Sequence, residues 1–208
     1  ALGIGTSAEP DARWQQLGEE LIRRWNEPHR RYHDERHLED VLLALNQLGV
    51  RGEQVAPVTL LAAWFHDAVY AGAVGAGAGS DERDSAELAM ASLSELGFSA
   101  ELLAHVSELI LATAPGASIA DPPAPLAHLL DADLAIFASP PSRYDEYAAA
   151  VRLEYAHVPE PAFRAGRAQI LEAYLAQPTI YRTDAARGLW EARARANVER
   201  EVGELRRG

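Results

Sequence analysis

The pair His66-Asp67 stands within the apolar segment Ala-Ala-Trp-Phe-His-Asp-Ala-Val-Tyr at 62–70, which we expect to belong to a buried helix. Burial of a carboxylate without a partner costs on the order of several kcal/mol, so Asp67 requires compensation. A bound cation, an arginine or a helix N-terminus would supply it. The alternative is a structural hydrogen bond between the histidine and the aspartate that joins two helices.

Two further acids, Asp131 and Asp133, interrupt a second apolar run, His-Leu-Leu-Asp-Ala-Asp-Leu-Ala-Ile-Phe at 128–137. Residues two apart on a helix point in different directions. We therefore expect one carboxylate to reach a shared site and the other to cap or orient a neighbouring segment. Acids on two separate apolar helices that meet at one cation would explain both segments together.

The segment Tyr-His-Asp-Glu-Arg-His at 32–37 places His33 and His37 four residues apart, on one face if the segment is helical. Two imidazoles on one face can bind a single metal, or one can bind metal while the other serves as acid or base. A solvated helix start is the alternative reading of this segment.

The composition limits the kind of site and the kind of partner. The chain has no cysteine, which excludes disulfides, thiolate sites and cysteine nucleophiles, so a metal must be held by His, Asp, Glu, backbone oxygen or water. Its net charge of -12 makes nucleic acid a poor partner. A small phosphorylated substrate remains compatible, because a metal and a few arginines reverse the field inside a pocket.

Nothing in the sequence indicates a membrane segment or a signal peptide, because no stretch reaches about 18 apolar residues and 1–10 lacks a charged and apolar leader pattern. We expect a cytoplasmic protein with a disordered lead-in at 1–10. A homodimer is expected only from the general frequency of homodimers.

Helical periodicity recurs between turns that contain proline and glycine, and no alternating strand pattern of convincing length is present. The sequence predicts an all-α, single-domain irregular helical bundle over 11–208. The glycine-rich segment 71–80 would be a lid over the site or a simple connector. Expected helices span 14–25, 37–48, 58–70, 81–96, 100–113, 126–137, 144–155, 161–176 and 183–206.

The order of these motifs resembles the HD superfamily of metal-dependent phosphohydrolases, whose ligands are a His, an adjacent His-Asp pair and a distant Asp on different helices. The resemblance implies His37, His66, Asp67 and Asp133 as the ligands. The segment at 32–37 also resembles the Tyr-His-Asn-x-x-His motif of cyclic-nucleotide phosphodiesterases, which share this helical fold. That motif implies His33 as the general acid.

The chain is more narrowly similar to a little-characterised bacterial group of predicted HD phosphohydrolases, over about residues 12–202. The matched segments are RRYHDERH, WFHDAVY, DERDSAELA, LLDADLAIFA, YAAAVRLEY and ARANVERE. The sequence departs from the group at Ala71, where an acid is frequent, and after Thr113, where a His is common. No pair of histidines completes a second metal site, because His105 and His128 have no matching spacing, so one metal is expected.

The resemblance implies a phosphohydrolase that hydrolyses a phosphoester or phosphoanhydride bond of a nucleotide or another small phosphorylated molecule. The divalent metal would be Mn, Fe, Co, Ni, Zn or Mg. Glu82, with Asp81 as the alternate, would orient water, and His33 would protonate the leaving oxygen. An HD-type di-iron oxygenase and a non-catalytic metal- or nucleotide-sensing module are the competing functions. Candidate substrate contacts are Arg36, Tyr181 and Arg182.

Overall fold

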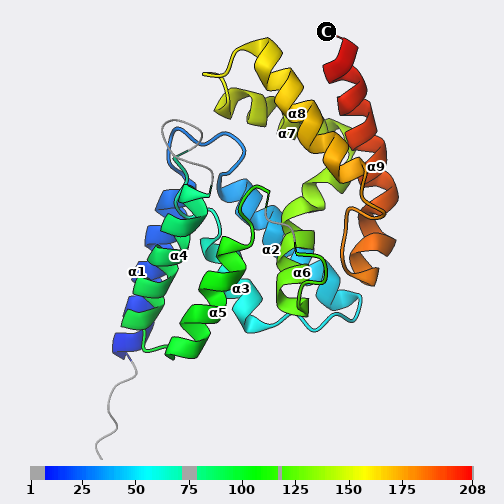
Figure 1. Cartoon of the computed structure of the whole chain (residues 1–208). Helices are drawn as coiled ribbons and strands as arrows, with labels where there is room; N and C mark the ends of the chain where they lie inside the picture. The colour runs from blue at the N-terminus through cyan, green and yellow to red at the C-terminus, as the bar shows by residue number, and fades with distance from the viewer. Residues whose placement is uncertain (1–7, 72–78, 117–118, 208) are drawn as a thin grey trace, which may run out of the picture.

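The computed structural model of the chain describes residues 8–71, 79–116 and 119–207, and these ranges contain helices and no strand (Figure 1). The prediction of an all-α chain is confirmed. The elements are α1 (Ala8–Trp25), α2 (Glu35–Val50), α3 (Pro57–Phe65), α4 (Ser80–Glu95), α5 (Ala100–Leu111), α6 (Ala124–Asp133), the 3-10 helix η1 (Leu134–Ala138), α7 (Pro141–Glu154), α8 (Glu160–Leu175) and α9 (Asp184–Arg207).

The short helix α3 lies at the centre of the molecule and packs against α2, α5 and α6 (Figure 1). Helices α1, α4 and α5 lie on one side of this centre, and α7, α8 and α9 lie on the other. Fully buried apolar side chains fill the space between the elements, as the helical periodicity predicts. They include Leu45, Leu48, Phe65, Ile110 and Leu129.

The helix that carries the His-Asp pair is shorter than predicted. It ends at Phe65 rather than at residue 70, and His66 is its C-cap. The next residues turn instead, with the amide of Ala68 donating to the carbonyl of Phe65 at 3.0 Å. Because the segment is apolar on nearly all sides, its periodicity gave no signal for this end. The pair therefore stands at the end of a buried helix, not in its middle.

Two helix starts also differ from the sequence expectation. Helix α1 begins at Ala8 rather than at residue 14, so residues 8–10 of the expected disordered lead-in are helical, and residues 1–7 lie outside the described residues. Helix α7 begins at Pro141 rather than at residue 144, with Pro140 at the cap position. Proline suits the first helical position, because its fixed φ is helical and the amide it lacks would be unpaired there.

Gly97 follows Leu96, the C-cap of α4, and ends the helix. Its φ of +85° lies in the left-handed region, its amide donates to Ser94 at 2.9 Å, and the amide of Phe98 donates to Leu93 at 3.2 Å. The proposed lid at 71–80 lies largely outside the described residues. No helix that the structure describes combines the length and the apolar character needed to cross a membrane.

Candidate metal centre

Four side chains from three parts of the chain converge beside α3. His37 lies in the first turn of α2, which Asp34 caps by accepting from the amides of Arg36 and His37 at 3.0 and 3.3 Å. His66 and Asp67 follow the end of α3, and Asp133 is the last residue of α6. Helix ends and turns thus present all four residues, which is why their side chains can point at one place.

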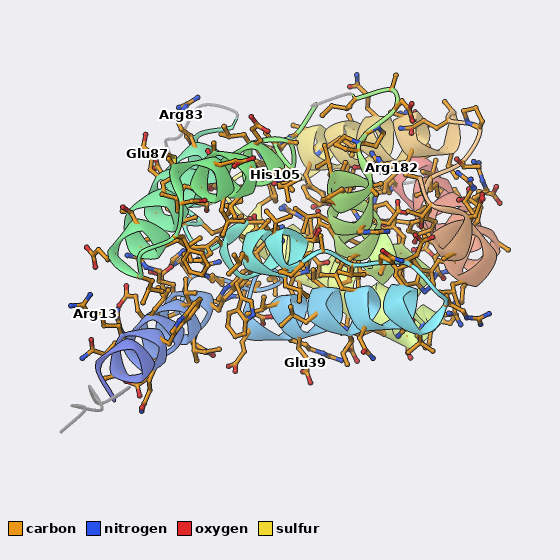
Figure 2. The ribbon with its side chains drawn as sticks, turned by 90° about the horizontal axis from the view of Figure 1, so that it is seen from below. Arg13, Glu39, Arg83, Glu87, His105 and Arg182 are labelled. Atoms are coloured by element: carbon orange, nitrogen blue, oxygen red, sulfur yellow. The ribbon has the colours of Figure 1, made fainter. Side chains whose placement is uncertain are left out.

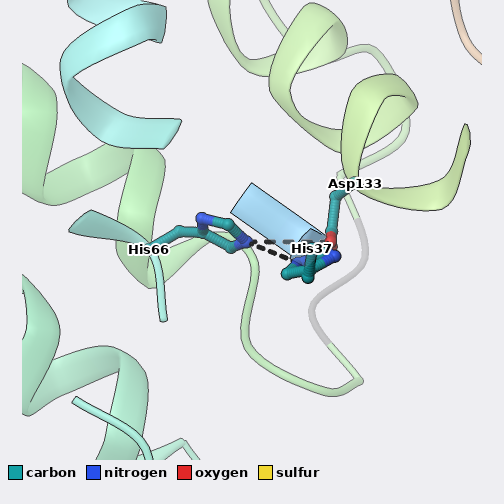
Figure 3. Close-up of side chains that lie close together, drawn as sticks. All are labelled: His37, His66 and Asp133. Carbon is teal, nitrogen blue, oxygen red and sulfur yellow. Dashed lines mark hydrogen bonds and ion pairs between the residues drawn. The ribbon is translucent and has the colours of Figure 1, made fainter. Parts of the chain in front are cut away.

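Figure 3 shows three of them, His37, His66 and Asp133, with their side chains directed at one another. His37 Nε2 is 3.1 Å from His66 Nε2 and 3.3 Å from Asp133 Oδ1. His66 Nε2 is 3.8 Å from Asp133 Oδ1. Asp67 Oδ2 is 3.6 Å from His37 Nε2 and 3.3 Å from His66 Nε2. The donor atoms of His37, His66 and Asp133 all lie within 4.8 Å of one another.

These separations fit one divalent cation. Ligand atoms held about 2.1 Å from a shared ion are about 3.0 Å apart at a right angle, about 3.4 Å at the tetrahedral angle and about 3.8 Å at 130°. The five distances above run from 3.1 to 3.8 Å. Two imidazoles and two carboxylates form a mixed nitrogen and oxygen donor set, which suits Mn, Fe, Co, Ni, Zn or, with water, Mg.

The hydrogen bonds around His66 prepare its Nε2 for a cation. His66 Nδ1 lies 2.9 Å from the carbonyl oxygen of Ala63, which can only accept, so Nδ1 carries the proton and donates. In the neutral ring, Nε2 then presents a lone pair to the cluster. Burial opposes protonation of His66, but the adjacent carboxylates of Asp67 and Asp133 raise its pKa to about 9. Burial opposes ionisation of Asp133, but its hydrogen bonds with His37 and His66 hold the pKa of Asp133 far below its usual value.

Within the part of the chain that the structure describes, the cluster is more exposed on its acidic side. The side chains of His37 and His66 are each 1% exposed, whereas those of Asp67 and Asp133 are 15% and 28% exposed. A cation held by these side chains would therefore face solvent on the side of the two carboxylates.

His33 stands next to the cluster but is held by a different residue. Its Nδ1 is 2.7 Å from Glu154 Oε2, and its ring stacks on Tyr70 at 4.4 Å between centroids. Its ring centroid is 5.7 Å from that of His37. Burial opposes the charged form, but the hydrogen bond to Glu154 and the nearby carboxylates raise the pKa of His33. The contact occupies Nδ1 and leaves Nε2 as the ring nitrogen for a substrate.

Glu154, at the end of α7, is a residue that the sequence reasoning did not single out. Its Oε1 accepts from the amides of Arg31, Tyr32 and His33 at 2.9, 2.8 and 3.0 Å. Its Oε2 also accepts from the Tyr70 hydroxyl at 3.0 Å. The matched segment at 147–155 contains it, but a single Glu near a helix end carries no signal for a contact 121 residues away.

Arg30 is the second residue that the sequence reasoning missed. This buried guanidinium donates to the carbonyls of His33 at 2.8 Å, Asp67 at 2.7 Å and Ala68 at 3.1 Å. It also lies over the ring of Trp25 at 5.4 Å. Arg30 thus joins the backbone of the His33 segment to that of the His-Asp turn, and so fixes the two halves of the site.

The two predicted acids at the start of α4 behave differently. Asp81 Oδ2 accepts from the amide of Ala71 at 3.1 Å, so Asp81 anchors the backbone after the His-Asp turn. Glu82 is half-buried, and burial and the charge of Asp67 raise its pKa. Of the two acids, Glu82 is therefore the one whose pKa responds to the charge of the cluster.

Asp131 takes the structural role predicted for one acid of its pair. It is fully buried, and it accepts from the amides of Arg182 and Thr183 at 2.7 and 2.8 Å and from the Thr183 hydroxyl at 2.8 Å. Asp131 therefore holds the segment before α9, while Asp133 points into the cluster. The geometry agrees with the choice of Asp133 over Asp131 as a candidate ligand.

The candidate substrate contacts do not gather at the cluster. Tyr181 is fully buried and donates to the carbonyl of Leu134 at 3.0 Å, so its expected role as a substrate contact is corrected to a packing role. Arg182 is three-quarters buried, 3.8 Å from Asp131, in the segment labelled in Figure 2. Arg36 lies on the exposed side of α2 and pairs with Glu146 at 3.0 Å.

The two histidines without matching spacing remain outside the cluster. His128 is buried in α6 and its Nε2 is 3.0 Å from Glu53 Oε2, so it links α6 to the loop after α2. His105 lies on α5 (Figure 2). Among the described residues, one group of three or more such side chains has donor atoms close enough for an ion. It consists of His37, His66 and Asp133, and the predicted ligand Asp67 is not part of it.

Comparison of the chain with family models, with curated proteins and with solved structures gave no match. The functional argument therefore rests on the geometry of the cluster and on the residues that hold it.

Proposed function

We propose that this chain is a metal-dependent phosphohydrolase of the HD type, acting on a nucleotide or another small phosphorylated molecule. The observation that supports this proposal is the cluster of His37, His66 and Asp133, with Asp67 beside both histidines. His33 lies next to this cluster and is held by Glu154. The two imidazoles and two carboxylates of the cluster do not need His33 for their packing, so a separate acid held beside them favours a catalytic role.

The four cluster residues would hold the ion and keep its position relative to His33. A divalent ion there would lower the pKa of a water molecule and offset negative charge on a phosphoryl oxygen. The hydrogen bond from His66 Nδ1 to Ala63 and the Arg30 contacts to the backbone limit movement of the ligands. Small displacements of such ligands weaken binding and activity, so these supporting contacts belong to the site.

His33 would donate the proton that the leaving oxygen needs when the phosphorus-oxygen bond breaks. Its raised pKa favours the protonated ring, and the carboxylate of Glu154 balances the charge. The water that attacks the phosphorus must lose a proton, and Glu82 is the candidate acceptor. Its raised pKa makes it a better base than an ordinary carboxylate.

The competing functions differ in what they require. An oxygenase with two irons needs a second set of ligands, and the described residues supply one cluster. A sensing module needs the metal cluster but not an acid aimed at a leaving group. The His33–Glu154 contact favours the hydrolase over the sensing module, because a positioned acid is used in bond breaking.

A panel of nucleotides, sugar phosphates and simple phosphate esters, assayed with Mn, Mg, Co, Ni and Zn, tests the proposal. Wild type should release phosphate or a phosphorylated product from at least one compound, and His66→Ala should not. His105→Ala serves as the matched control, because it removes a histidine outside the cluster. If every metal-loaded sample is as inactive as His66→Ala on the whole panel, the hydrolase proposal is wrong.

A further inference from the structure

A hollow that is separate from the metal cluster opens on the surface of the molecule. It has a volume of about 430 Å³ and is bounded by α2, η1, the start of α7 and the middle of α9. None of the four candidate ligands lines it. Sites for small ligands have volumes of about 300 to 1,000 Å³, so the hollow is large enough for one.

Three arginines, Arg36, Arg143 and Arg193, line this hollow in a chain whose net charge is -12. Arg143 pairs with Asp40 at 2.7 Å, and Arg36 pairs with Glu146 at 3.0 Å. Arg193 is exposed and has no carboxylate or hydrogen-bond partner among the residues that the structure describes. The hollow therefore keeps one uncompensated positive charge, and the paired guanidinium groups retain further N–H donors.

The wall between η1 and α7 adds neutral donors. The hydroxyl oxygen of Ser139 is buried without a hydrogen-bond partner, and Ser139 lines the hollow. Helix α7 starts beside it, and no side chain caps its first amides. Unpaired amides and the positive end of the helix dipole favour an anion. The arginines of the lining and the uncapped start of α7 therefore favour the same kind of ligand, an anion.

The floor of the hollow is apolar. Leu43, Ile136 and Trp190 contribute to it, and Trp190 is largely buried. Cationic groups at a rim and an apolar floor match a molecule that joins a phosphate to an uncharged body. A long polyanion fits poorly, because the rest of the surface is strongly acidic.

We propose that this hollow, which we call the outer site, binds a small phosphorylated molecule, with Arg193 as the main phosphate contact. The outer site is separate from the metal cluster, and its binding does not depend on the proposed hydrolase activity. Its walls include α2, which carries His37, and η1, which directly follows Asp133 in the chain. A molecule bound in the outer site would restrain the two elements that position His37 and Asp133. Its binding would thereby regulate metal binding at the cluster.

Calorimetric titration with inorganic pyrophosphate and with ADP, in EDTA and at low salt, tests the outer site. The chelator prevents a metal at the cluster from contributing to binding. Wild type should bind saturably, and Arg193→Ala should bind about tenfold more weakly, since a charge-assisted hydrogen bond has been removed. Tighter binding of ADP would show that the apolar floor also takes part, while equal binding would assign the phosphate contacts alone.

Arg83→Ala is the matched control, because Arg83 is an exposed arginine on α4, a helix that contributes no residue to the outer site. It removes the same charge and should bind like wild type. His33→Ala should also bind like wild type, whereas loss of binding in this variant would place the anion at the cluster. The outer site is rejected by that result, by the absence of saturable binding in wild type, or by equal weakening in Arg193→Ala and Arg83→Ala.

Discussion

Replacement of Glu154 by glutamine should remove a defined, pH-dependent part of the free energy of unfolding. Glu154 is 2% exposed and accepts five hydrogen bonds, from three amides, the His33 ring and the Tyr70 hydroxyl. Burial opposes its ionisation, but these contacts lower its pKa to about 2 from an ordinary value of 4.5. The gap between these values corresponds to about 3 kcal/mol of stability near pH 7.

The sign of the pH dependence follows from the lowered pKa. A carboxylate whose pKa is lower in the folded state stabilises the fold above its unfolded pKa and loses this effect as pH falls. The contribution of Glu154 should therefore be complete above about pH 5, fall to about 1.5 kcal/mol at pH 3 and vanish below pH 2. Glu154→Gln keeps the side-chain size and lacks this titration.

Urea unfolding followed by circular dichroism at pH 7, 5 and 3, in EDTA, measures this contribution. The difference between wild type and Glu154→Gln should be about 3 kcal/mol at pH 7 and should shrink by about half at pH 3. Glu146→Gln, at a site on α7 that is 58% exposed, is the control and should stay within about 0.5 kcal/mol of wild type. A difference under 0.5 kcal/mol for Glu154→Gln, or one that grows as pH falls, would refute the reasoning.

Three further predictions follow from the site and its supports. His33→Ala should retain the metal but lower kcat by about 10² to 10⁴-fold, measured by metal analysis and steady-state assay; metal loss would make His33 a ligand instead. Asp131→Ala should cost about 2 to 4 kcal/mol in urea unfolding because two amides lose their acceptor, while metal content is kept; Asp133→Ala should show the opposite pattern. Gly97→Ala should cost about 1 kcal/mol, because its φ of +85° suits glycine, and an unchanged unfolding midpoint would contradict this.

The all-α fold followed from periodicity, because each helix buries one apolar face and the pattern repeats along the chain. Helix ends were predicted less well, since α3 is apolar on nearly all sides and its pattern could not mark an end at Phe65. That end depends on Arg30, whose donation to the carbonyls of Asp67 and Ala68 supports the turn. A contact between residues 37 positions apart leaves no local mark in the sequence.

His66 and Asp67 were identifiable because buried polar residues in an apolar segment demand a partner, whereas Asp133 and His37 were chosen over Asp131 and His33 through the resemblance to the HD superfamily. Their order along the chain, rather than any one motif, pointed to a shared site. Glu154 was missed because it is the last residue of a helix that contains many polar residues, and an acid in such a place carries no signal. Its role arises from the packing of α7 beside the His33 segment, which only the three-dimensional structure shows.

The metal content of the purified chain tests the central claim most directly. Wild type, dialysed free of excess metal and analysed by mass spectrometry, should hold about one equivalent of a divalent ion. His66→Ala and Asp67→Ala should lose it, while His105→Ala should keep it. A wild type that binds no divalent ion from any of the supplied metals, or a His66→Ala variant that binds as much as wild type, would contradict the account.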